Sequence, residues 1–289
     1  MLRCARGELP VNVALAQLFV AARDSRAARR ALNTAIHHLQ QRGHGERLQR
    51  LCRMRDLWSD TPDAFANVKV AARAVNHRRH GNRGRTTPGS WSRMFDRAVE
   101  ATPDASVALY CLGRADLLRA ATDEIVRCLA SWHLLHPGCA VLDLGCGSGR
   151  LAEGLASRVG VVVGTDVSAR MLEAARRRCR HVENAHVVRT SGIDLAAFSD
   201  ACFDLVCALD VFPYFVISGL AQTHLREAAR VLRPRGHLLI INYSYDSDAA
   251  ESRRHLCRLA QSVRLRLLRF GTAEFALWDG VCFLLQKRP

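Results

Sequence analysis

The sequence predicts an α/β fold built on a parallel sheet, with a helical region in front of it. Three observations predict this fold. The apolar run Val141–Leu144 leads into a turn with glycines at positions 145, 147 and 149. A second apolar run ends at Asp166, 21 residues after Gly145. Before these strands, residues 10–75 repeat apolar side chains at the three- and four-residue spacing of helices.

The turn after the first strand favours a bound nucleoside cofactor. Gly145 and Gly147 let the backbone adopt conformations that a Cβ atom disfavours, so a ligand can lie against bare main chain. We expect the amides of the turn and the following helix to meet an anionic group of that ligand. Asp166, at the end of the next strand, can accept both hydroxyls of a ribose.

The spacing of the glycines excludes two common nucleotide-binding motifs. A dinucleotide fingerprint needs glycine at the sixth position of G-x-G-x-x-G, where this chain has Arg150. No Lys-Ser or Lys-Thr pair follows, so the turn is not a P-loop. An acidic residue, Asp143, precedes the first glycine by two positions. With Asp143 and Asp166 in place, a purely structural strand–helix turn is the weaker interpretation.

These residues resemble motif I of the class I methyltransferases that depend on S-adenosylmethionine (SAM), with Asp166 as the family's acidic residue after the second strand. The resemblance covers about residues 114–289. Phe203–Val206 is similar to the family's fourth strand, and Pro234 and Gly236 are similar to its turn before the fifth strand. The resemblance implies a Rossmann-like, doubly wound, mostly parallel sheet of seven strands, with an antiparallel last strand inserted beside the sixth.

The resemblance also implies which residues hold the cofactor. An acidic cluster tolerates the ammonium and sulfonium charges of SAM. The family's acidic residue after the third strand, which accepts the adenine amino group, is replaced here by Ser191. Asp194 follows three residues later and can substitute only if the loop bends. The cofactor-binding residues that we predict are Asp143, Gly145, Cys146, Gly147, Asp166, Val167, Ser191, Gly192, Ile193 and Leu209.

Methyl transfer from a sulfonium is a direct displacement, which needs alignment of the reacting atoms but no metal. Asp210, at the carboxyl end of the fourth strand, is the candidate catalytic residue because it could orient or deprotonate an acceptor. A turn cap is an equally good interpretation of Asp210. The Asp/Asn-Pro-Pro-Tyr motif of nucleic-acid amino methyltransferases is absent, since only Pro213-Tyr214 matches it. His224, Tyr243 and Tyr245 are candidate pocket walls.

The chain is predicted to have three parts. Residues 1–75 form a helical region, with helices over 10–41 (interrupted at Asp24-Ser25), 46–57 and 63–75. Residues 76–90 are basic, rich in glycine and nearly free of apolar side chains, which predicts a linker. An RNA-binding arm is the alternative, but the segment lacks interleaved aromatic residues. The methyltransferase domain is residues 91–289, with its core at 136–289. Its leading helices are expected over 91–98 and 114–132. Its last strands are expected over 263–270 and 275–286, with residues 278–280 as a bulge or loop within the second.

Charge and cysteine usage narrow the location and the partners. The chain has 42 basic and 27 acidic residues, and the excess is larger before residue 136. A basic region can bind nucleic acid or an acidic membrane, but 40 of the 42 basic residues are arginine, so compositional bias is the preferred explanation. The eleven cysteines show no C-x-x-C pair, which favours a reduced, cytoplasmic protein without zinc. No signal peptide or membrane span is expected.

We therefore predict an enzyme, a SAM-dependent methyltransferase that transfers a methyl group to a small molecule. One alternative is an RNA- or protein-directed methyltransferase that uses the basic N-terminal region. The other is a non-enzymatic interaction protein that retains the fold. Neither a membrane partner nor a metal is predicted, and the sequence leaves open the attacking atom and the oligomeric state.

Overall fold

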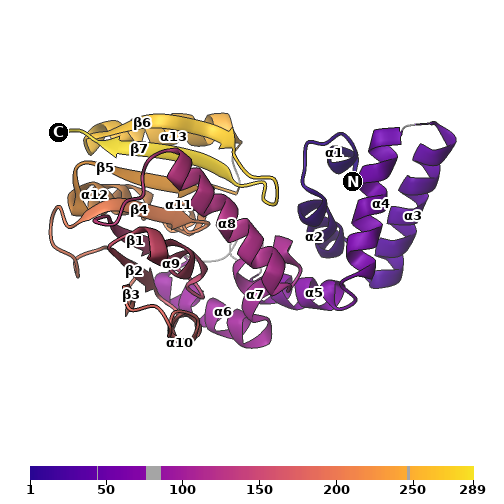
Figure 1. Cartoon of the computed structure of the whole chain (residues 1–289), viewed down its shortest axis with the longest axis horizontal. Coiled ribbons are helices and arrows are strands. Elements are labelled where there is room, and N and C mark those ends of the chain that lie inside the picture. Colours follow the sequence, from indigo (N-terminus) through magenta and orange to yellow (C-terminus); the bar gives the residue numbers. More distant parts are fainter. Residues whose placement is uncertain (44, 76–85, 246–247) are drawn as a thin grey trace. The chain divides into compact units, whose positions relative to one another are not determined.

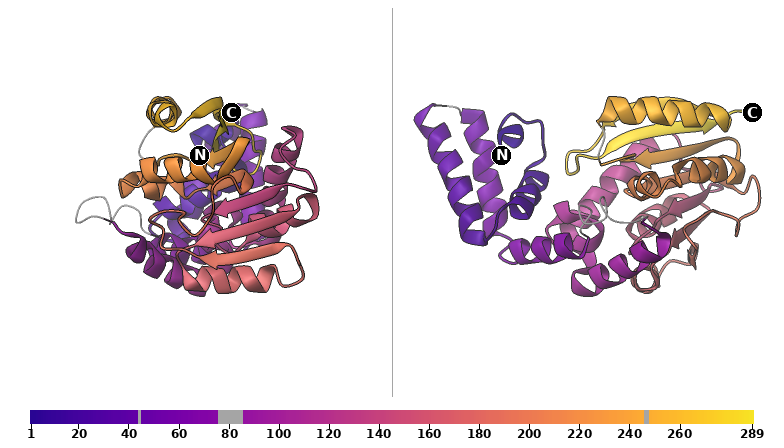
Figure 2. Two further views of the ribbon diagram at one scale, coloured as in Figure 1. Left: turned by 90° about the vertical axis from the view of Figure 1, so that its left-hand side faces the viewer. Right: turned by 180° about the vertical axis from the view of Figure 1, so that it is seen from behind.

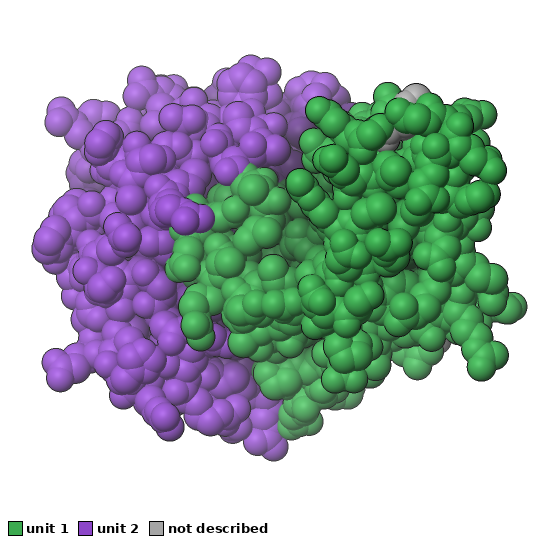
Figure 3. Space-filling view, turned by 45° about the vertical axis from the view of Figure 1, so that its right-hand side comes forward, with its two compact units in different colours: residues 1–76, 97–124, 275–279 green, residues 77–96, 125–274, 280–289 purple. Residues whose placement is uncertain are grey.

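A computed structural model of the chain describes residues 1–43, 45–75, 86–245 and 248–289 (Figure 1). The chain divides into two compact units, each assembled from three separate segments (Figure 3). The helical unit comprises Met1–Asn76, Arg97–Glu124 and Phe275–Asp279. The sheet unit comprises His77–Asp96, Ile125–Glu274 and Gly280–Pro289.

The sheet unit contains a seven-stranded sheet in the order β3-β2-β1-β4-β5-β7-β6 (Figure 1). Strands β1 to β5 pair in parallel, and β7 is antiparallel to both β5 and β6. The doubly wound sheet and its inserted last strand are therefore confirmed. The strands are β1 (Ala140–Leu144), β2 (Val161–Asp166), β3 (Ala185–Arg189), β4 (Phe203–Leu209), β5 (Leu232–Ile241), β6 (Leu265–Ala273) and β7 (Val281–Lys287).

Helices cover both faces of this sheet (Figure 2). The β2–β3 and β4–β5 connections run in opposite directions along the sheet, so right-handed crossovers place their helices on opposite faces. On one face α9 packs on α10, and on the other α12 packs on α13. The helices and the 3₁₀ turn of this unit are α9 (Arg150–Leu155), η3 (Ala156–Arg158), α10 (Ala169–Arg178), α11 (Phe212–Ile217), α12 (Ala221–Val231) and α13 (Ala249–Ser262).

The central strands form the core because helices exclude water from both of their faces. All five residues of β1 are buried. Val206 of β4, Ile240 of β5 and Leu285 of β7 have no exposed surface. Near-continuous apolar runs of this kind are typical of strands covered on both sides. The carboxylate of Asp143 is thus placed in an otherwise apolar strand.

The helical unit packs the apolar faces that the sequence periodicity predicted. The ring of Phe19 in α2 contacts Trp58 of α4 at 4.7 Å and Phe65 of α5 at 5.3 Å, both edge to face. The elements of this unit are α1 (Leu2–Ala5), α2 (Val11–Ala21), α3 (Ser25–Gln41), α4 (Gly45–Ser59), α5 (Ala64–Ala74), α7 (Pro103–Val107) and η2 (Leu109–Cys111). The helices α6 (Pro88–Ala101) and α8 (Ala115–Ser131) each contribute residues to both units.

The connection between β6 and β7 is part of the helical unit. The Asn12 side-chain amide donates to the carbonyl oxygens of Tyr110 (3.0 Å) and Leu277 (2.8 Å). One carboxylate oxygen of Glu124 accepts the N–H groups of Ala276 and Leu277 at 3.1 and 3.0 Å. Residues 275–280, expected as the start of the last strand, are therefore not in the sheet, and β7 begins at Val281.

The aromatic residues of this connection also pack in the helical unit. Trp278 is 3% exposed and stacks on the rings of Tyr110 and Phe275, both at 5.5 Å. The aromatic run at the end of the chain therefore reflects packing against helices, although it has the composition of a strand.

The other predicted helices are confirmed, with small shifts at their ends. The helices expected over 10–41, 46–57 and 63–75 are α2 to α5, and Ser168 caps α10 by accepting the N–H of Met171 at 3.0 Å. Of the predicted linker, residues 76–85 lie outside the described residues. Residues 88–90 are helical, because α6 begins at Pro88.

The turn before the fifth strand differs from its prediction. The helix α12 ends at Val231, but β5 already begins at Leu232 and includes Pro234. The left-handed residue is Arg235, with φ 65°, and not Gly236. Gly236 is required for another reason: a Cβ atom there would lie 2.9 Å from the carbonyl oxygen of Arg233 and 3.0 Å from that of Asp204.

Candidate active site

The candidate site lies at the carboxyl ends of β1 and β4, where the strand order reverses. β1 and β4 are neighbours in the sheet, with Asp143 opposite Cys207. Beyond these ends follow the glycine turn after β1 and Asp210 after β4. A crevice at such a switch point is where open α/β sheets bind ligands.

The glycine turn needs glycine for both conformation and space. Gly145, Gly147 and Gly149 have φ angles of 74°, 53° and 78°, in the left-handed region. A Cβ atom on Gly145 would lie 2.7 Å from Cγ2 and 2.8 Å from Cβ of Val211. The residue beside Asp210 therefore packs directly on the turn, which brings the ends of β1 and β4 together.

The amides of the turn are used within the chain. The N–H groups of Gly145 and Cys146 both donate to the carbonyl oxygen of Thr165 at 2.8 Å. The N–H of Gly147 donates to Asp166 at 3.0 Å, and that of Gly149 to the carbonyl of Cys146 at 3.0 Å. The expectation that the turn amides meet an anionic ligand group therefore does not hold for these four amides. Three of them fix the turn against β2, and the N–H of Gly149 closes the turn on itself.

Asp166 is held with its carboxylate at the turn. Its Oδ2 accepts the N–H of Gly147, and its Oδ1 accepts the N–H of Ser168 at 2.8 Å. Burial raises the pKa of Asp166, and these backbone hydrogen bonds oppose the increase. Each carboxylate oxygen has a second lone pair, so both can still accept ribose hydroxyls.

Asp143 is a buried carboxylate whose Oδ2 has no hydrogen-bond partner among the described residues. The residue is 2% exposed, and burial raises its pKa to about 7 although the charge of Arg150 opposes the increase. The hydroxyls of Ser148 and Thr165 are buried and unpartnered in the same described part of the chain. Buried polar atoms are normally paired, so the Asp143 carboxylate, in the strand that leads into the glycine turn, can accept a polar ligand group.

The other predicted cofactor residues lie around this centre in different ways. The Cys146 thiol lies toward β2, because a Cβ atom on Gly164 would be 2.9 Å from its Sγ. The carbonyl of Val167 accepts from Ser92 Oγ at 3.1 Å and from Arg189 Nε at 3.2 Å. Leu209 is the last residue of β4 and is half-buried.

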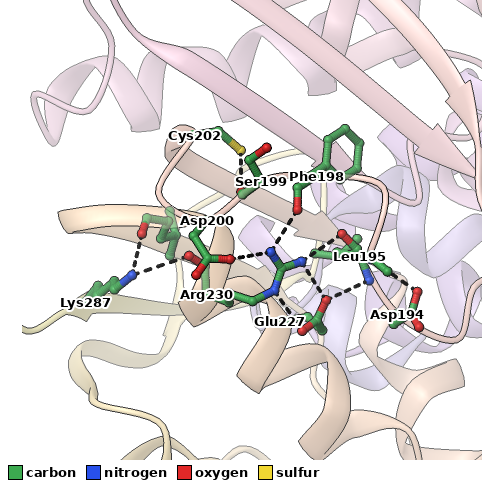
Figure 4. A network of polar contacts seen from close by, with 11 residues as sticks. Asp194, Leu195, Phe198, Ser199, Asp200, Cys202, Glu227, Arg230 and Lys287 are labelled. Carbon is green, nitrogen blue, oxygen red and sulfur yellow. Dashed lines mark hydrogen bonds and ion pairs between the residues drawn. The ribbon is translucent and has the colours of Figure 1, made fainter.

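The predicted adenine segment, residues 191–193, follows β3. Gly192 has a φ of 72° and is buried, and a Cβ atom there would lie 2.5 Å from Cγ1 of Val167. Ser191 is exposed and its Oγ accepts the N–H of Ile193 at 3.2 Å, while Ile193 is 53% exposed. Asp194, labelled in Figure 4, accepts the N–H of Ala196 at 3.2 Å. It also lines a pocket together with residues of α12.

The first half of α6 closes the site from the side of β2. Asp96 Oδ1 accepts the hydroxyl of Ser168 at 2.6 Å and the N–H of Arg170 at 3.1 Å. Trp91 and Phe95 contact the ring of Tyr214 edge to face at 5.5 and 5.4 Å. Asp96 was not predicted, because it lies 72 residues before Ser168 and no local pattern connects the two.

The end of the site at β4 and β5 is built from two left-handed residues. Asp210 and Asn242 have φ angles of 55° and 59°. Asp210 Oδ1 accepts the Asn242 side-chain N–H at 2.7 Å and the Tyr245 hydroxyl at 2.9 Å. Asn242 is itself fixed, since its Oδ1 accepts the N–H of Val281 at 2.9 Å. Asp and Asn adopt this conformation more readily than other non-glycine residues. The sequence analysis missed Asn242.

Tyr214 links the two ends of the site. It is 8% exposed, and burial raises the pKa of its hydroxyl well above the ordinary value, with further contributions from the charges of Asp210 and Asp166. Two of the three predicted pocket walls, His224 and Tyr243, are core residues. His224 is buried against the ring of Phe215, and the Tyr243 hydroxyl bonds His255 Nδ1 at 3.1 Å.

Residues 142–240 match the family described as "Methyltransferase domain". This range runs from β1 to β5 and contains the glycine turn, Asp166 and Asp210. Residues 142–240 of the chain form a methyltransferase domain. This match agrees with the class I, SAM-dependent family that the sequence resembles.

Two curated relatives resemble the methyltransferase domain. One is the demethylmenaquinone methyltransferase of Tropheryma whipplei, 35% identical over 153 residues, which are 53% of this chain and 59% of the relative. Another is the ubiquinone biosynthesis O-methyltransferase of Alkalilimnicola ehrlichii, 33% identical over 118 residues, which are 40% of this chain and 45% of the relative. The chain thus spans about half the length of these relatives.

A solved structure shares the fold. It is the phosphoethanolamine N-methyltransferase 1 of Haemonchus contortus in complex with phosphoethanolamine and S-adenosylhomocysteine, with a TM-score of 0.55. The match covers 70% of this chain and 49% of that chain at 18% identity, so it shows the fold alone.

The described residues contain no group of His, Cys, Asp and Glu that could hold a metal ion. No helix in the described part of the chain is long and apolar enough to span a membrane.

Proposed function

We propose that the methyltransferase domain binds SAM at the glycine turn and transfers its methyl group to a small molecule. The observation that carries the proposal is the buried, unpartnered carboxylate oxygen of Asp143 beside Asp166. A cationic ligand would stabilise both carboxylates in their charged forms. The ammonium and sulfonium groups of SAM are cations of this kind.

Residues around the glycine turn would each contact a different part of the cofactor. Asp143 would face the ammonium group, Asp166 the ribose hydroxyls and residues 191–193 the adenine. When bound, SAM supplies a methyl group on a positively charged sulfur, which needs no further activation. The tasks of the chain are then to align the acceptor and to exclude water.

Asp210 would hold the acceptor. Its carboxylate is oriented by Asn242 and Tyr245, and Val211 places it next to the glycine turn. A carboxylate fixed in this way can orient an acceptor hydroxyl, amine or acidic carbon and can take its proton. The matched relatives are named for transfer to quinone compounds, and the solved structure for transfer to nitrogen. We therefore propose the small-molecule class and not one acceptor.

A titration of the full chain with SAM tests the cofactor assignment. Asp166→Ala should weaken binding by ~1.5–3 kcal/mol, typical of lost hydrogen bonds to a charged group. Asp56→Ala is the matched control, because Asp56 is exposed and pairs with the adjacent Arg55. Calorimetry that finds no binding to the wild type, or equal binding to both variants, would refute the assignment.

A screen of metabolite extracts with methyl-labelled SAM tests the acceptor end. With an acceptor found, Asp210→Asn should lower kcat by about 10²-fold and leave SAM affinity unchanged, because the amide keeps the shape but cannot take a proton. An unchanged kcat would remove Asp210 from the mechanism.

We also infer a reducing location such as the cytoplasm. All eleven cysteines are free, and several are core residues, including Cys139, Cys207 and Cys282. Disulfides are typical of oxidising compartments and rare in the cytosol. Labelling of fractionated cells with an antibody to the chain would test this inference.

A further inference from the structure

The loop between β3 and β4 is held by one arginine side chain (Figure 4). Arg230, in the last turn of α12, donates from Nη1 to the carbonyl of Phe198 at 2.8 Å and to Asp200 Oδ1 at 2.7 Å. Its Nη2 donates to the carbonyl of Leu195 at 2.9 Å. These bonds attach three points of a segment without helix or strand to one rigid helix.

Glu227, one turn earlier on α12, completes the attachment. Its two carboxylate oxygens accept Nε and Nη2 of Arg230 at 3.0 and 2.8 Å, a bidentate ion pair. Glu227 Oε2 also accepts the N–H of Leu195 at 3.2 Å. The pair therefore holds both backbone polar groups of Leu195, whose side chain is 1% exposed.

The end of the loop is fixed to the same helix terminus. The N–H of Ala201 donates to the carbonyl of Arg230 at 3.0 Å, and that of Cys202 to the carbonyl of Val231 at 2.9 Å. The ammonium of Lys287 in β7 donates to the carbonyl of Leu232 at 2.6 Å. Residues 195–202 are thus attached to the C-terminal half of α12 by several hydrogen bonds.

The adenine segment, residues 191–193, lies directly before this attached part. At its other end Thr190 donates its N–H to the carbonyl of Asp166 at 3.1 Å. Ser191 and Ile193 are exposed between the two anchors. With Ser191 at the position of the family's acidic residue, the position of the backbone at 191–193 must decide which base is accepted.

We propose that Arg230 and Glu227 are positioning residues for base recognition, which they exert by fixing Leu195 and thereby the backbone of residues 191–193. The inference rests on the proposed binding of SAM. Adenine presents an acceptor at N1 and a donor at its amino group, and hypoxanthine reverses both. Backbone N–H and C=O groups can distinguish these patterns only if they are held to within about half an ångström.

The test compares S-adenosylhomocysteine with S-inosylhomocysteine by calorimetry on the full chain. The wild type should prefer the adenine compound at least about tenfold, because the mismatched base leaves backbone groups unpaired. Arg230→Lys keeps the charge but loses the bidentate geometry, and Glu227→Gln keeps the shape but loses the charge. We expect the preference to fall at least about fivefold in both variants. Arg233→Lys is the control, since Arg233 pairs with Asp204 and not with the loop.

Each outcome bears on the inference. A lower preference in both variants, with the control unchanged and thermal unfolding still cooperative, would support it. Variants that unfold at lower temperature but keep the wild-type preference would show a purely structural role and overturn it. A wild type that binds both compounds equally would also overturn it while leaving the SAM site intact. A wild type that binds neither would refute the proposed function itself. If Arg230→Lys does not fold, Glu227→Gln decides.

Discussion

The two units treat their buried polar groups differently. In the helical unit, Asn12 donates to two carbonyls, and the hydroxyls of Ser106 and Thr122 each donate to one. The Thr102 hydroxyl is buried without a partner among the described residues. In the sheet unit, the unpartnered atoms of Asp143, Ser148 and Thr165 belong to β1, the glycine turn and β2, and those of Thr86, His224 and Thr272 lie elsewhere.

This difference separates residues kept for stability from residues kept for binding. An unpaired buried polar group costs about 1–3 kcal/mol of stability, so it persists where a ligand supplies the missing partner. Substitutions that remove an unpartnered polar group near the glycine turn should therefore weaken binding while leaving or raising the stability of the free protein. Substitutions in the helical unit should lower stability and leave binding unchanged.

The largest effect is expected for Gly145→Ala. The new Cβ atom would lie 2.7 Å from Val211 at a φ of 74°, so the turn must move away from the site. We expect SAM affinity to fall by more than about 100-fold, since a misplacement of 1 Å has effects of this size. The control is Gly219→Ala, which has a φ of 75° but no heavy atom within 4 Å. It should cost about 1 kcal/mol of stability with no change in calorimetric affinity; equal losses in both variants would contradict the space argument.

Asp143→Asn should change stability in the opposite direction to a usual core substitution. The pKa of Asp143 is about 7 in the folded protein, against 3.8 for an ordinary Asp side chain. Between these pH values the folded protein therefore holds a proton on Asp143 that the unfolded chain has released. The wild type should therefore lose stability as pH rises from about 4 to about 7, by at most about 4 kcal/mol. The variant should lack this loss and be the more stable protein at pH 8, yet bind SAM more weakly.

Chemical denaturation at pH 5 and pH 8 measures the Asp143 effect. Asp56→Asn serves as control, because Asp56 is an exposed carboxylate of α4. If wild type and Asp143→Asn show the same pH dependence, Asp143 is not the buried carboxylate that the site requires.

Asn12→Ala tests the other half of the comparison. Removing the Asn12 side-chain amide leaves the carbonyls of Tyr110 and Leu277 without this donor. We therefore expect the free energy of unfolding to fall by about 1–3 kcal/mol. Asn33→Ala, at an exposed position of α3, should change it by less than about 0.5 kcal/mol. SAM affinity should be the same in both, and a weaker affinity in Asn12→Ala would show that the helical unit takes part in binding.

The smallest effect on the cofactor is expected from removing residues 1–85, which leaves α6 whole. We predicted a linker at 76–90 from composition, so limited proteolysis should cut between Arg78 and Arg85. The fragment 86–289 should bind SAM within about threefold of the full chain. It should unfold at a lower temperature, because residues 97–124 and 275–279 lose their partners in the helical unit. Loss of SAM binding by a folded fragment would make the helices an integral lid.

The sequence predicts the cofactor half of the site better than the acceptor half. Gly145, Gly147 and Asp166 act through backbone freedom and strand ends, which leave a local pattern. Asp96 and Asn242 act across 72 and 32 residues, through contacts that exist only after the sheet forms. Gly236 was assigned to the turn before the fifth strand by resemblance alone, and its need for space comes from the carbonyl oxygens of Arg233 and of Asp204 on another strand.

Contacts between residues far apart in the sequence also explain why residues 275–280 were predicted as part of a strand. Phe275 and Trp278 have the β-propensity of a strand, and nothing near them in the sequence indicates that helices hold them. The helices α2 to α5 were predictable because hydrophobic periodicity is local and strong there. The topology of the sheet was predicted only through the resemblance to the family.

The bond between Asn12 and Leu277 joins residues 265 positions apart. During synthesis, domains generally fold in the order in which they emerge. Here the helices α1 to α5 emerge first, yet Trp278, which stacks on Tyr110, is made only after β6. The part of the protein that the ribosome makes first is therefore completed only shortly before the last strand, β7, and its Tyr110–Trp278 stack must wait for six of the seven strands to be translated.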